Sequence, residues 1–129
     1  MVDTSELIEQ ARIAQERARA PHSNYPVGAA LLADSGKLYL GCNIESGAFP
    51  TTICAKRVAI FAAIAAGENA FQALAVVSND GGMPCGSCRQ VIYEQCGEIP
   101  IFIVDRNSST PKQFTTSQLL PFPFDLKKT

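Results

Sequence analysis

Three cysteines carry the clearest chemistry in this sequence. Cys85 and Cys88 are separated by two residues, a spacing that directs two sulfurs at one ion. Cys54 comes earlier and opens an apolar run over residues 55–66. If both segments form helices, the cysteines lie at helix N-termini, where a partial positive charge stabilises a thiolate. Three thiolates on two adjacent helix ends make a soft site that suits zinc, with the fourth position left for water.

The same spacing has other interpretations. A Cys-x-x-Cys pair is also typical of half a structural zinc site, of a redox pair, or of two buried thiols. Cys42 and Cys96 each offer a fourth thiolate, which would close the site and make it purely structural. His22 is the single histidine and lies in a loop without a partner motif, so we expect a solvated side chain rather than a ligand.

The bulk composition is that of an ordinary globular protein. The 129 residues favour a single domain, 1–129, that is large enough to bury a hydrophobic core. A net charge of -1 gives no electrostatic reason to expect a nucleic-acid polymer or an anionic membrane as partner. A small ligand of low charge is the simpler expectation.

The cysteine count indicates the compartment. Five cysteines is an odd number, and their spacing is not that of a secreted disulfide framework. The chain does not open with a charged and then apolar signal segment, and its longest apolar run is too short to span a bilayer. We therefore expect a cytoplasmic protein whose reduced thiols are free to hold metal.

The hydrophobic patterns predict that helices and strands alternate along the chain. The expected helices cover residues 4–20, 54–67, 85–97 and 116–120. The expected strands cover residues 27–32, 37–43, 71–78 and 99–105. Residues 33–36 are expected to turn between the first two strands, and residues 106–113 are expected to form a turn as well.

This order of elements predicts an α/β fold. Strands separated by single helices imply parallel neighbours with right-handed crossovers, and the opening hairpin supplies an antiparallel edge. We expect a three-layer α/β/α sandwich around a mixed five-stranded sheet. In such sheets the site lies at strand C-terminal ends beside helix N-termini, where the three cysteines fall. Asn43 and Glu45 stand two residues apart at a strand end and can face one polyol, although a turn asparagine and a surface glutamate are the ordinary alternative.

Five ordered segments resemble the small homotetrameric cytidine deaminases, and the likeness covers nearly the whole chain. The segments are YPVGAAL (25–31), GCNIES (41–46), TICAKR (52–57), PCGSCRQ (84–90) and LLP (119–121). The resemblance implies a cytidine deaminase-like fold, a homotetramer with sites shared across interfaces, and a pyrimidine nucleoside as small-molecule substrate. It also implies one Zn²⁺ per subunit, held by Cys54, Cys85 and Cys88.

The resemblance further implies roles for individual residues. Tyr25 stands where an aromatic side chain packs on the pyrimidine, and Ala55 offers its backbone to the ligand. Asn43 and Glu45 become contacts for the sugar hydroxyls. By the same resemblance, Arg57 and the turn from Pro84 to Arg89 donate hydrogen bonds to the ligand thiolates. Phe124 and Phe49 stand at positions that meet a neighbouring subunit.

One residue departs from the family pattern. The family's Cys-Ala-Glu-Arg motif uses its glutamate as the proton shuttle, and this sequence has Lys56 there. Zinc activates water for attack on C4 of the cytosine ring, and the carboxylate takes the proton and delivers it to N3. An ammonium cannot accept that proton, and assistance of this kind is worth about a hundredfold to ten-thousandfold. Zinc with three thiolates is formally negative, which favours a charged Lys56 lying towards the thiolates.

Three functions therefore stand as alternatives. The first is zinc-dependent hydrolytic deamination of cytidine and deoxycytidine to uridine and deoxyuridine in pyrimidine salvage, or deamination of a related aminopyrimidine nucleoside, slowed by Lys56. The second is a catalytically silent zinc paralogue that binds a nucleoside or a sister subunit. The third is a closed structural zinc module. A polynucleotide-editing deaminase is disfavoured by the net charge of -1 and by the lack of a basic or aromatic stripe.

Overall fold

The computed structural model describes residues 3–108 and 110–125, so residues 1–2, 109 and 126–129 of the predicted domain lie outside it. One five-stranded sheet has the order β2-β1-β3-β4-β5. Its strands are β1 (Val27–Ala33), β2 (Leu38–Cys42), β3 (Phe71–Ser78), β4 (Pro100–Asp105) and β5 (Lys112–Thr115). The helices are α1 (Thr4–Gln15), α2 (Ala55–Ala65), α3 (Gly86–Cys96) and α4 (Thr116–Leu119), with a 3-10 turn η1 (Phe49–Thr51). The predicted mixed five-stranded α/β fold is confirmed.

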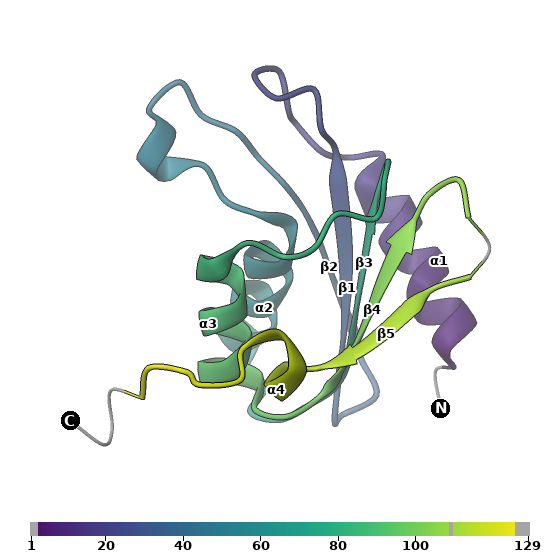
Figure 1. The fold of residues 1–129 in the computed structure, drawn as a ribbon, viewed down its shortest axis with the longest axis vertical. Helices are drawn as coiled ribbons and strands as arrows, with labels where there is room; N and C mark the ends of the chain where they lie inside the picture. Colours follow the sequence, from purple (N-terminus) through teal and green to yellow (C-terminus); the bar gives the residue numbers. More distant parts are fainter. Residues whose placement is uncertain (1–2, 109, 126–129) are drawn as a thin grey trace.

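Three layers are visible in Figure 1, with α1 on one face of the sheet and α2 and α3 on the other. The β1–β2 hairpin is antiparallel and β2 forms an edge, as predicted. β3 and β4 are parallel neighbours joined through α3, which also agrees with the prediction. The connection through α2 differs, because it leads from β2 past β1 to β3, and β1 pairs with β3 antiparallel.

The fifth strand lies partly where a turn was predicted. The prediction of a turn over residues 106–113 is wrong at its end, because Lys112 already pairs with Ile103 of β4. β5 is four residues long, Lys-Gln-Phe-Thr, with two residues exposed and none buried. Its side chains do not alternate in hydrophobicity, and its pairing depends on backbone hydrogen bonds. A local hydrophobic pattern cannot reveal such a strand.

α1 is shorter than predicted. It begins at the expected cap, where Asp3 Oδ1 accepts a hydrogen bond from Glu6 N at 2.8 Å, but ends at Gln15 rather than at residue 20. Beyond it, Arg19 N donates to Asn43 O at 2.9 Å and Glu45 N donates to Arg19 O at 2.8 Å. These bonds hold residue 19 extended, because its backbone pairs with the chain that leaves β2 instead of continuing the helix.

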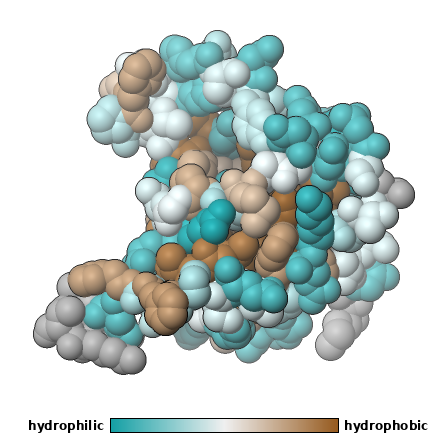
Figure 2. All heavy atoms as spheres, viewed as in Figure 1, coloured by the Kyte–Doolittle hydropathy of each residue, from teal (hydrophilic) through white to brown (hydrophobic). Residues whose placement is uncertain are grey.

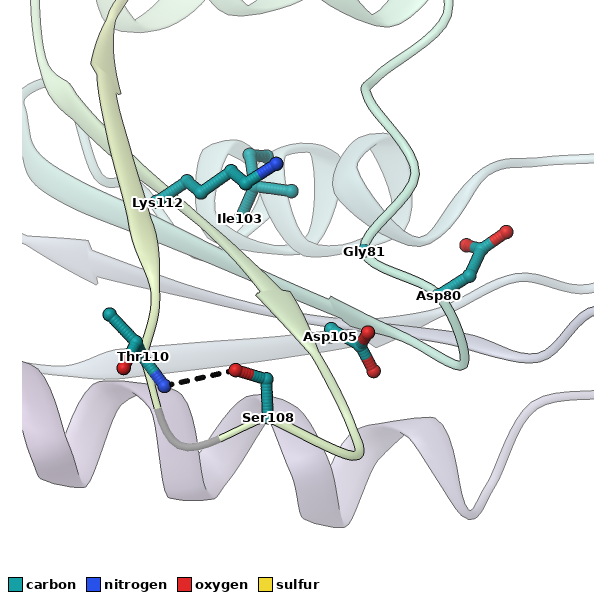
Figure 3. A pocket seen from close by; sticks show the side chains of 7 residues that line it. All are labelled: Asp80, Gly81, Ile103, Asp105, Ser108, Thr110 and Lys112. Carbon is teal, nitrogen blue, oxygen red and sulfur yellow. Dashed lines mark hydrogen bonds between the residues drawn. The ribbon is translucent and has the colours of Figure 1, made fainter.

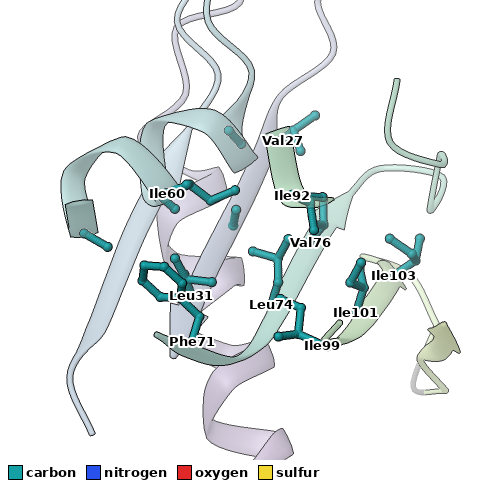
Figure 4. Packing of buried hydrophobic residues seen from close by; sticks show 14 of the residues in the cluster. Val27, Leu31, Ile60, Phe71, Leu74, Val76, Ile92, Ile99, Ile101 and Ile103 are labelled. Atoms are coloured by element: carbon teal, nitrogen blue, oxygen red, sulfur yellow. The ribbon is translucent and has the colours of Figure 1, made fainter. Parts of the chain in front are cut away.

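The larger core lies between the sheet and the pair α2 and α3 (Figure 4). Leu31, Ile60, Leu74 and Ile92 are fully buried there, and each such side chain contributes about 1.5–3 kcal/mol on burial. Close packing of the helices on the sheet also requires small residues. A Cβ at Gly41 of β2 would lie 2.2 Å from the backbone oxygen of Ala55, so glycine lets α2 approach the sheet.

No helix in the described part of the chain combines the length and the apolar character needed to cross a bilayer.

Candidate active site

Two helix N-termini bring the three predicted cysteines together. Cys54 is the N-cap of α2 and Cys85 the N-cap of α3, and neither side chain caps its own helix. Cys88 lies in the first turn of α3 and is fully buried. The three sulfurs all lie within 4.8 Å of one another, and Cys85 and Cys88 are 3.4 Å apart.

The cluster fits one zinc ion. Zinc–sulfur bonds of about 2.3 Å in a tetrahedron place the sulfurs about 3.8 Å apart, a separation that these thiols can reach with small adjustments. The donor set is the soft one that zinc prefers. Cys42 and Cys96 do not join the cluster within the described residues, so neither supplies the fourth thiolate of a closed site. Burial in the core raises the pKa of Cys96 to about 12, which suits an inert thiol.

The Cys54 thiol is already polarised towards metal binding. The pKa of Cys54 is lowered to about 4, first because the Cys88 thiol hydrogen-bonds to it, and further by Arg57 and by the charge of Lys56. The pKa of Cys88 is raised, because it hydrogen-bonds to the Cys54 thiolate and is buried. One thiolate is therefore present at neutral pH, and zinc binding would release the remaining protons.

Two arginines surround the cysteines. Arg57 Nη2 lies 3.4 Å from Cys54 Sγ, and this contact raises the pKa of Arg57, while its buried Nε has no partner among the described residues. Arg89 Nε donates to Pro84 O and its Nη1 to Leu119 O, each at 2.8 Å. Arg89 thus fixes the turn before Cys85 against the end of α4. The sequence pattern did not single out this anchor.

Lys56, the residue after the first position of α2, is buried, with 7 % of its surface exposed. Its positive charge lowers the pKa of both Cys54 and Cys88, so the amine lies near both sulfurs. Within the described part of the chain it makes no hydrogen bond or ion pair to a carboxylate. A buried charge needs a partner of opposite sign, and the thiolates of the cluster are the anions that can supply one.

Glu45 borders a cavity of about 330 Å³ that His22, Phe49 and Thr52 also line. Its carboxylate accepts hydrogen bonds from His22 N at 2.8 Å, from Ser23 N at 3.1 Å and from the Ser23 hydroxyl. The Ser23 hydroxyl is the main reason that the pKa of Glu45 is lowered. The volume lies within the range of small-ligand sites. His22 is exposed, as predicted, but also meets Phe49 edge-on at 5.7 Å.

Asn43 is buried, and its side chain holds the backbone around Pro26. Its Oδ1 accepts from Val27 N at 2.9 Å, and its Nδ2 donates to Tyr25 O at 3.0 Å. A primary amide has two donors and two lone pairs, so one donor and one acceptor remain for a ligand. The side chain therefore positions Tyr25 as well as offering a polar group at the strand end.

The two aromatic residues predicted at the site differ in exposure. The half-buried Tyr25 packs against the main core, and its hydroxyl donates to Asp80 Oδ1 at 2.5 Å. Phe124 is 58 % exposed and its backbone oxygen accepts from Gln90 Nε2 at 2.8 Å. Figure 2 shows a hollowed face with apolar residues inside it and on the projections at its rim. Ala55 is fully buried at the start of α2.

Gln15 is a further residue that the sequence did not reveal. It is buried at the end of α1, and its Nε2 donates to Pro26 O at 3.0 Å and to Asn79 Oδ1 at 3.1 Å. Its Oε1 accepts from Arg106 Nη1 at 2.6 Å. These contacts join segments far apart in the sequence, so no local pattern could have indicated them.

Comparison with known proteins agrees with this geometry. The family model described as "Cytidine and deoxycytidylate deaminase zinc-binding region" matches residues 1–103. A cytidine deaminase from Sporosarcina psychrophila is 44% identical over 95% of this chain and 92% of its own length. One from Halalkalibacterium halodurans is 38% identical over 95% of each chain. A crystal structure of cytidine deaminase from Burkholderia pseudomallei superimposes with a TM-score of 0.91 at 38% identity, over 95% of this chain and 100% of that one.

The fold and the three-cysteine cluster define a zinc-binding α/β domain. With 44% identity to one relative and a family match over most of its length, the chain belongs to the cytidine and deoxycytidylate deaminase family of hydrolases.

Proposed function

We propose that this chain binds one zinc ion per subunit together with a pyrimidine nucleoside, and that it deaminates cytidine and deoxycytidine far more slowly than a family member with the usual glutamate. The observation that carries the proposal is the burial of Lys56 beside the cysteine cluster. The relatives' names supply the substrate class.

The residues of the chain divide the task. Cys54, Cys85 and Cys88 would hold zinc, which when bound supplies Lewis-acid activation of water for attack on C4 of the pyrimidine. Arg57 offsets the negative charge of the thiolates, as its contact with Cys54 supports. Lys56 can donate hydrogen bonds towards the reacting atoms, but as an ammonium it cannot take the proton from water.

The nucleoside would be held from several sides. Tyr25 forms a wall for the base, and the backbone of Ala55 hydrogen-bonds to the ligand. Glu45 accepts hydrogen bonds from the sugar hydroxyls, and Asn43 offers them its remaining donor and acceptor. The lowered pKa of Glu45 supports this role, because an ionised carboxylate is a strong acceptor. We further propose a cytoplasmic homotetramer in which Phe124 and the exposed Phe49 meet neighbouring subunits. Sedimentation velocity on the purified protein tests the assembly.

Restoring the carboxylate tests the role of position 56. We expect Lys56→Glu to raise the rate of uridine release from cytidine by about a hundredfold or more, because a positioned general base is worth that much. Lys56→Gln is the matched control: it removes the positive charge without supplying a base, and its rate is expected to stay low. Zinc content is measured by elemental analysis on all three proteins.

Two outcomes would overturn the proposal. The charge argument is wrong if the unaltered chain turns over at about 1–10³ per second, the usual range for enzymes. A Lys56→Glu protein that holds zinc but stays inert would show that the defect lies elsewhere in the pocket.

A silent zinc paralogue is the second candidate, and Lys56 is also the feature that favours it. Titration calorimetry with cytidine separates the two candidates. If the chain binds cytidine without turning it over, and Lys56→Glu also binds cytidine without turnover, the chain is a binding protein. If the substrate is instead a related aminopyrimidine nucleoside, the Lys56→Glu protein releases ammonia faster from that compound than from cytidine.

A further inference from the structure

The segment 79–84 connects the end of β3 to Cys85 and has little burial to hold it in place. Four of its six residues are exposed, and Gly81 and Gly82 give it wide conformational freedom. Cys85 and Cys88 follow directly, so the position of two of the three clustered sulfurs depends on how this segment is fixed.

Gln15 and Asn107 hold Asn79 at the start of the segment, and Arg89 holds Pro84 at its end. A hydrogen-bonded group centred on Asp80 fixes the part between them. The Tyr25 hydroxyl donates to Asp80 Oδ1 at 2.5 Å, and the same oxygen accepts from Gly82 N at 3.0 Å. Gly82 N lies 3.1 Å from Ser78 Oγ as well. The hydrogen bond from Tyr25 is the main cause that lowers the pKa of Asp80, so the acceptor is ionised at neutral pH. Figure 3 shows the Asp80 carboxylate pointing away from the small cavity beside Asp105.

Gly82 is matched to the hydroxyl of Tyr25. A Cβ at this position would lie 2.4 Å from Tyr25 Oη, whereas the next atoms, Asp80 Oδ1 and Tyr25 Cζ, would be 3.3 Å and 3.6 Å away. The hydroxyl therefore accounts for the clash that excludes a side chain here. Its neighbour Gly81 has a φ of +70° and packs against Asp105 at the end of β4.

We propose that the Tyr25 hydroxyl and the Asp80 carboxylate form a positioning pair that holds the segment 79–84 and thereby presents Cys85 and Cys88 to the metal. Tyr25 then has two separate functions: its ring packs at the site and its hydroxyl orders the chain that carries two ligands. The pair touches no metal and acts only through the segment. This proposal requires the zinc site but not turnover.

Metal affinity provides the test, with cobalt(II) as a probe whose thiolate complexes absorb visible light. Tyr25→Phe and Asp80→Ala are expected to weaken cobalt binding by about fivefold to thirtyfold, the factor for one hydrogen bond to a charged group at a partly exposed position. Asp80→Asn keeps an acceptor oxygen, so its cobalt affinity is expected to fall less than that of Asp80→Ala. All titrations are run well below the melting temperature.

Tyr39→Phe is the matched control. The Tyr39 hydroxyl also donates to a carboxylate, Glu68 Oε2 at 2.7 Å, but Glu68 follows the C-terminal end of α2 while Cys54 precedes its N-terminus. This variant loses the same kind of bond and is expected to bind cobalt within about twofold of the unaltered chain. Equal weakening by Tyr25→Phe and Tyr39→Phe would reduce the effect to general stability and overturn the proposal.

The clash at Gly82 gives a second, independent test. Gly82→Ala is expected to displace the hydroxyl from Asp80 and weaken cobalt binding about as much as Tyr25→Phe does. In the Tyr25→Phe background the 2.4 Å clash is gone and the tightest remaining contact of the methyl is Asp80 Oδ1 at 3.3 Å, which a small shift of that exposed side chain relieves. The double variant is therefore expected to bind cobalt like Tyr25→Phe alone. Additive losses, or cobalt affinity unchanged in Tyr25→Phe and Asp80→Ala, would overturn the positioning role. A variant that fails to fold is replaced in the comparison by Asp80→Ala, which alters an exposed side chain.

Discussion

Lys56 and Glu45 show how much a single side chain can decide in this molecule. Both positions follow from matched motifs in the sequence, yet their environments differ. Lys56 is buried beside sulfur anions, whereas Glu45 is a half-buried carboxylate that accepts hydrogen bonds from the backbone of residues 22 and 23 and from the Ser23 hydroxyl. The residue at position 56 affects the rate of the reaction, whereas the residue at position 45 affects how the stability of the fold depends on pH.

Glu45 is expected to make part of the stability of the protein pH-dependent. Its pKa in the folded protein lies below the ordinary value of 4.5. The carboxylate therefore stabilises the fold above pH 4.5, and this contribution is lost as the pH falls through the lowered pKa. We expect Glu45→Gln to lower the melting temperature at pH 7, and the difference from the unaltered chain to be smaller at pH 3, below the ordinary value of 4.5. Calorimetric melts at both pH values check this. A difference that grows on acidification contradicts it.

At the scale of elements, the sequence predicted the two helices that carry the cysteines closely. Cys54 and Gly67 enclose α2 and Cys85 and Gly97 enclose α3, and both glycines adopt positive φ after the helix, as C-terminal signals do. The errors lie where pairing between distant segments decides the structure. Residue 19 leaves α1 to pair with the chain after β2, and β5 depends on the neighbouring strand β4.

The site follows the same division. Spacing predicted the pair of Cys85 and Cys88, because ligand separation along a helix start is a local property. Cys54 was placed beside them by the expected order of helices and strands, which brings two helix N-termini together. Asp80 and Gln15 were not predicted, since each acts through a partner elsewhere in the chain. Arg89 was named only within the turn expected to donate to the thiolates, and its contact with Leu119 O was not predicted. Hydrogen bonds between distant segments leave no periodic trace in a single sequence.

Two glycines offer a comparison of how helices are positioned. Gly41→Ala is expected to destabilise the fold by about 1–3 kcal/mol through overpacking, because the new Cβ would meet Ala55 O at 2.2 Å. Since Ala55 follows Cys54 directly, metal affinity is expected to fall too. Gly28→Ala creates the same kind of clash with α1, at 2.1 Å from Ala11 O. It reaches the cluster only indirectly, through Gln15 and Asn79, so it is expected to lower stability with a smaller loss of metal affinity. Urea unfolding and cobalt titration measure both. Equal metal affinity in the two variants argues against the link from α2 to the cluster.

At the scale of the whole molecule, the metal centre would link α2 and α3, which the sheet connects only indirectly. Cys54 begins one helix and Cys85 another, and β3 lies between them in the sequence. An ion held by both would restrain the two helices on one face of the sheet. Its binding free energy is then part of the folding free energy, since the unfolded chain has no preformed site.

Removing zinc is expected to lower the melting temperature. A ligand present at a thousand times its dissociation constant stabilises the folded state by about 4 kcal/mol, which corresponds to roughly 10–20 °C for a domain of this size. Calorimetry before and after chelation, and again after zinc is restored, measures the shift. Cys42→Ser serves as control because Cys42 lies outside the cluster, so its shift should match that of the unaltered chain. Loss of the shift in Cys42→Ser would place this sulfur among the ligands.

The short strand β5 limits how copies of this protein can meet. It is an outer strand of only four residues that follows Pro111 and begins with the exposed Lys112. Proline offers no amide hydrogen and lysine resists desolvation, so this border discourages an additional strand from another molecule. Fibril-like growth by continuation of the sheet is thereby suppressed on this side of the molecule.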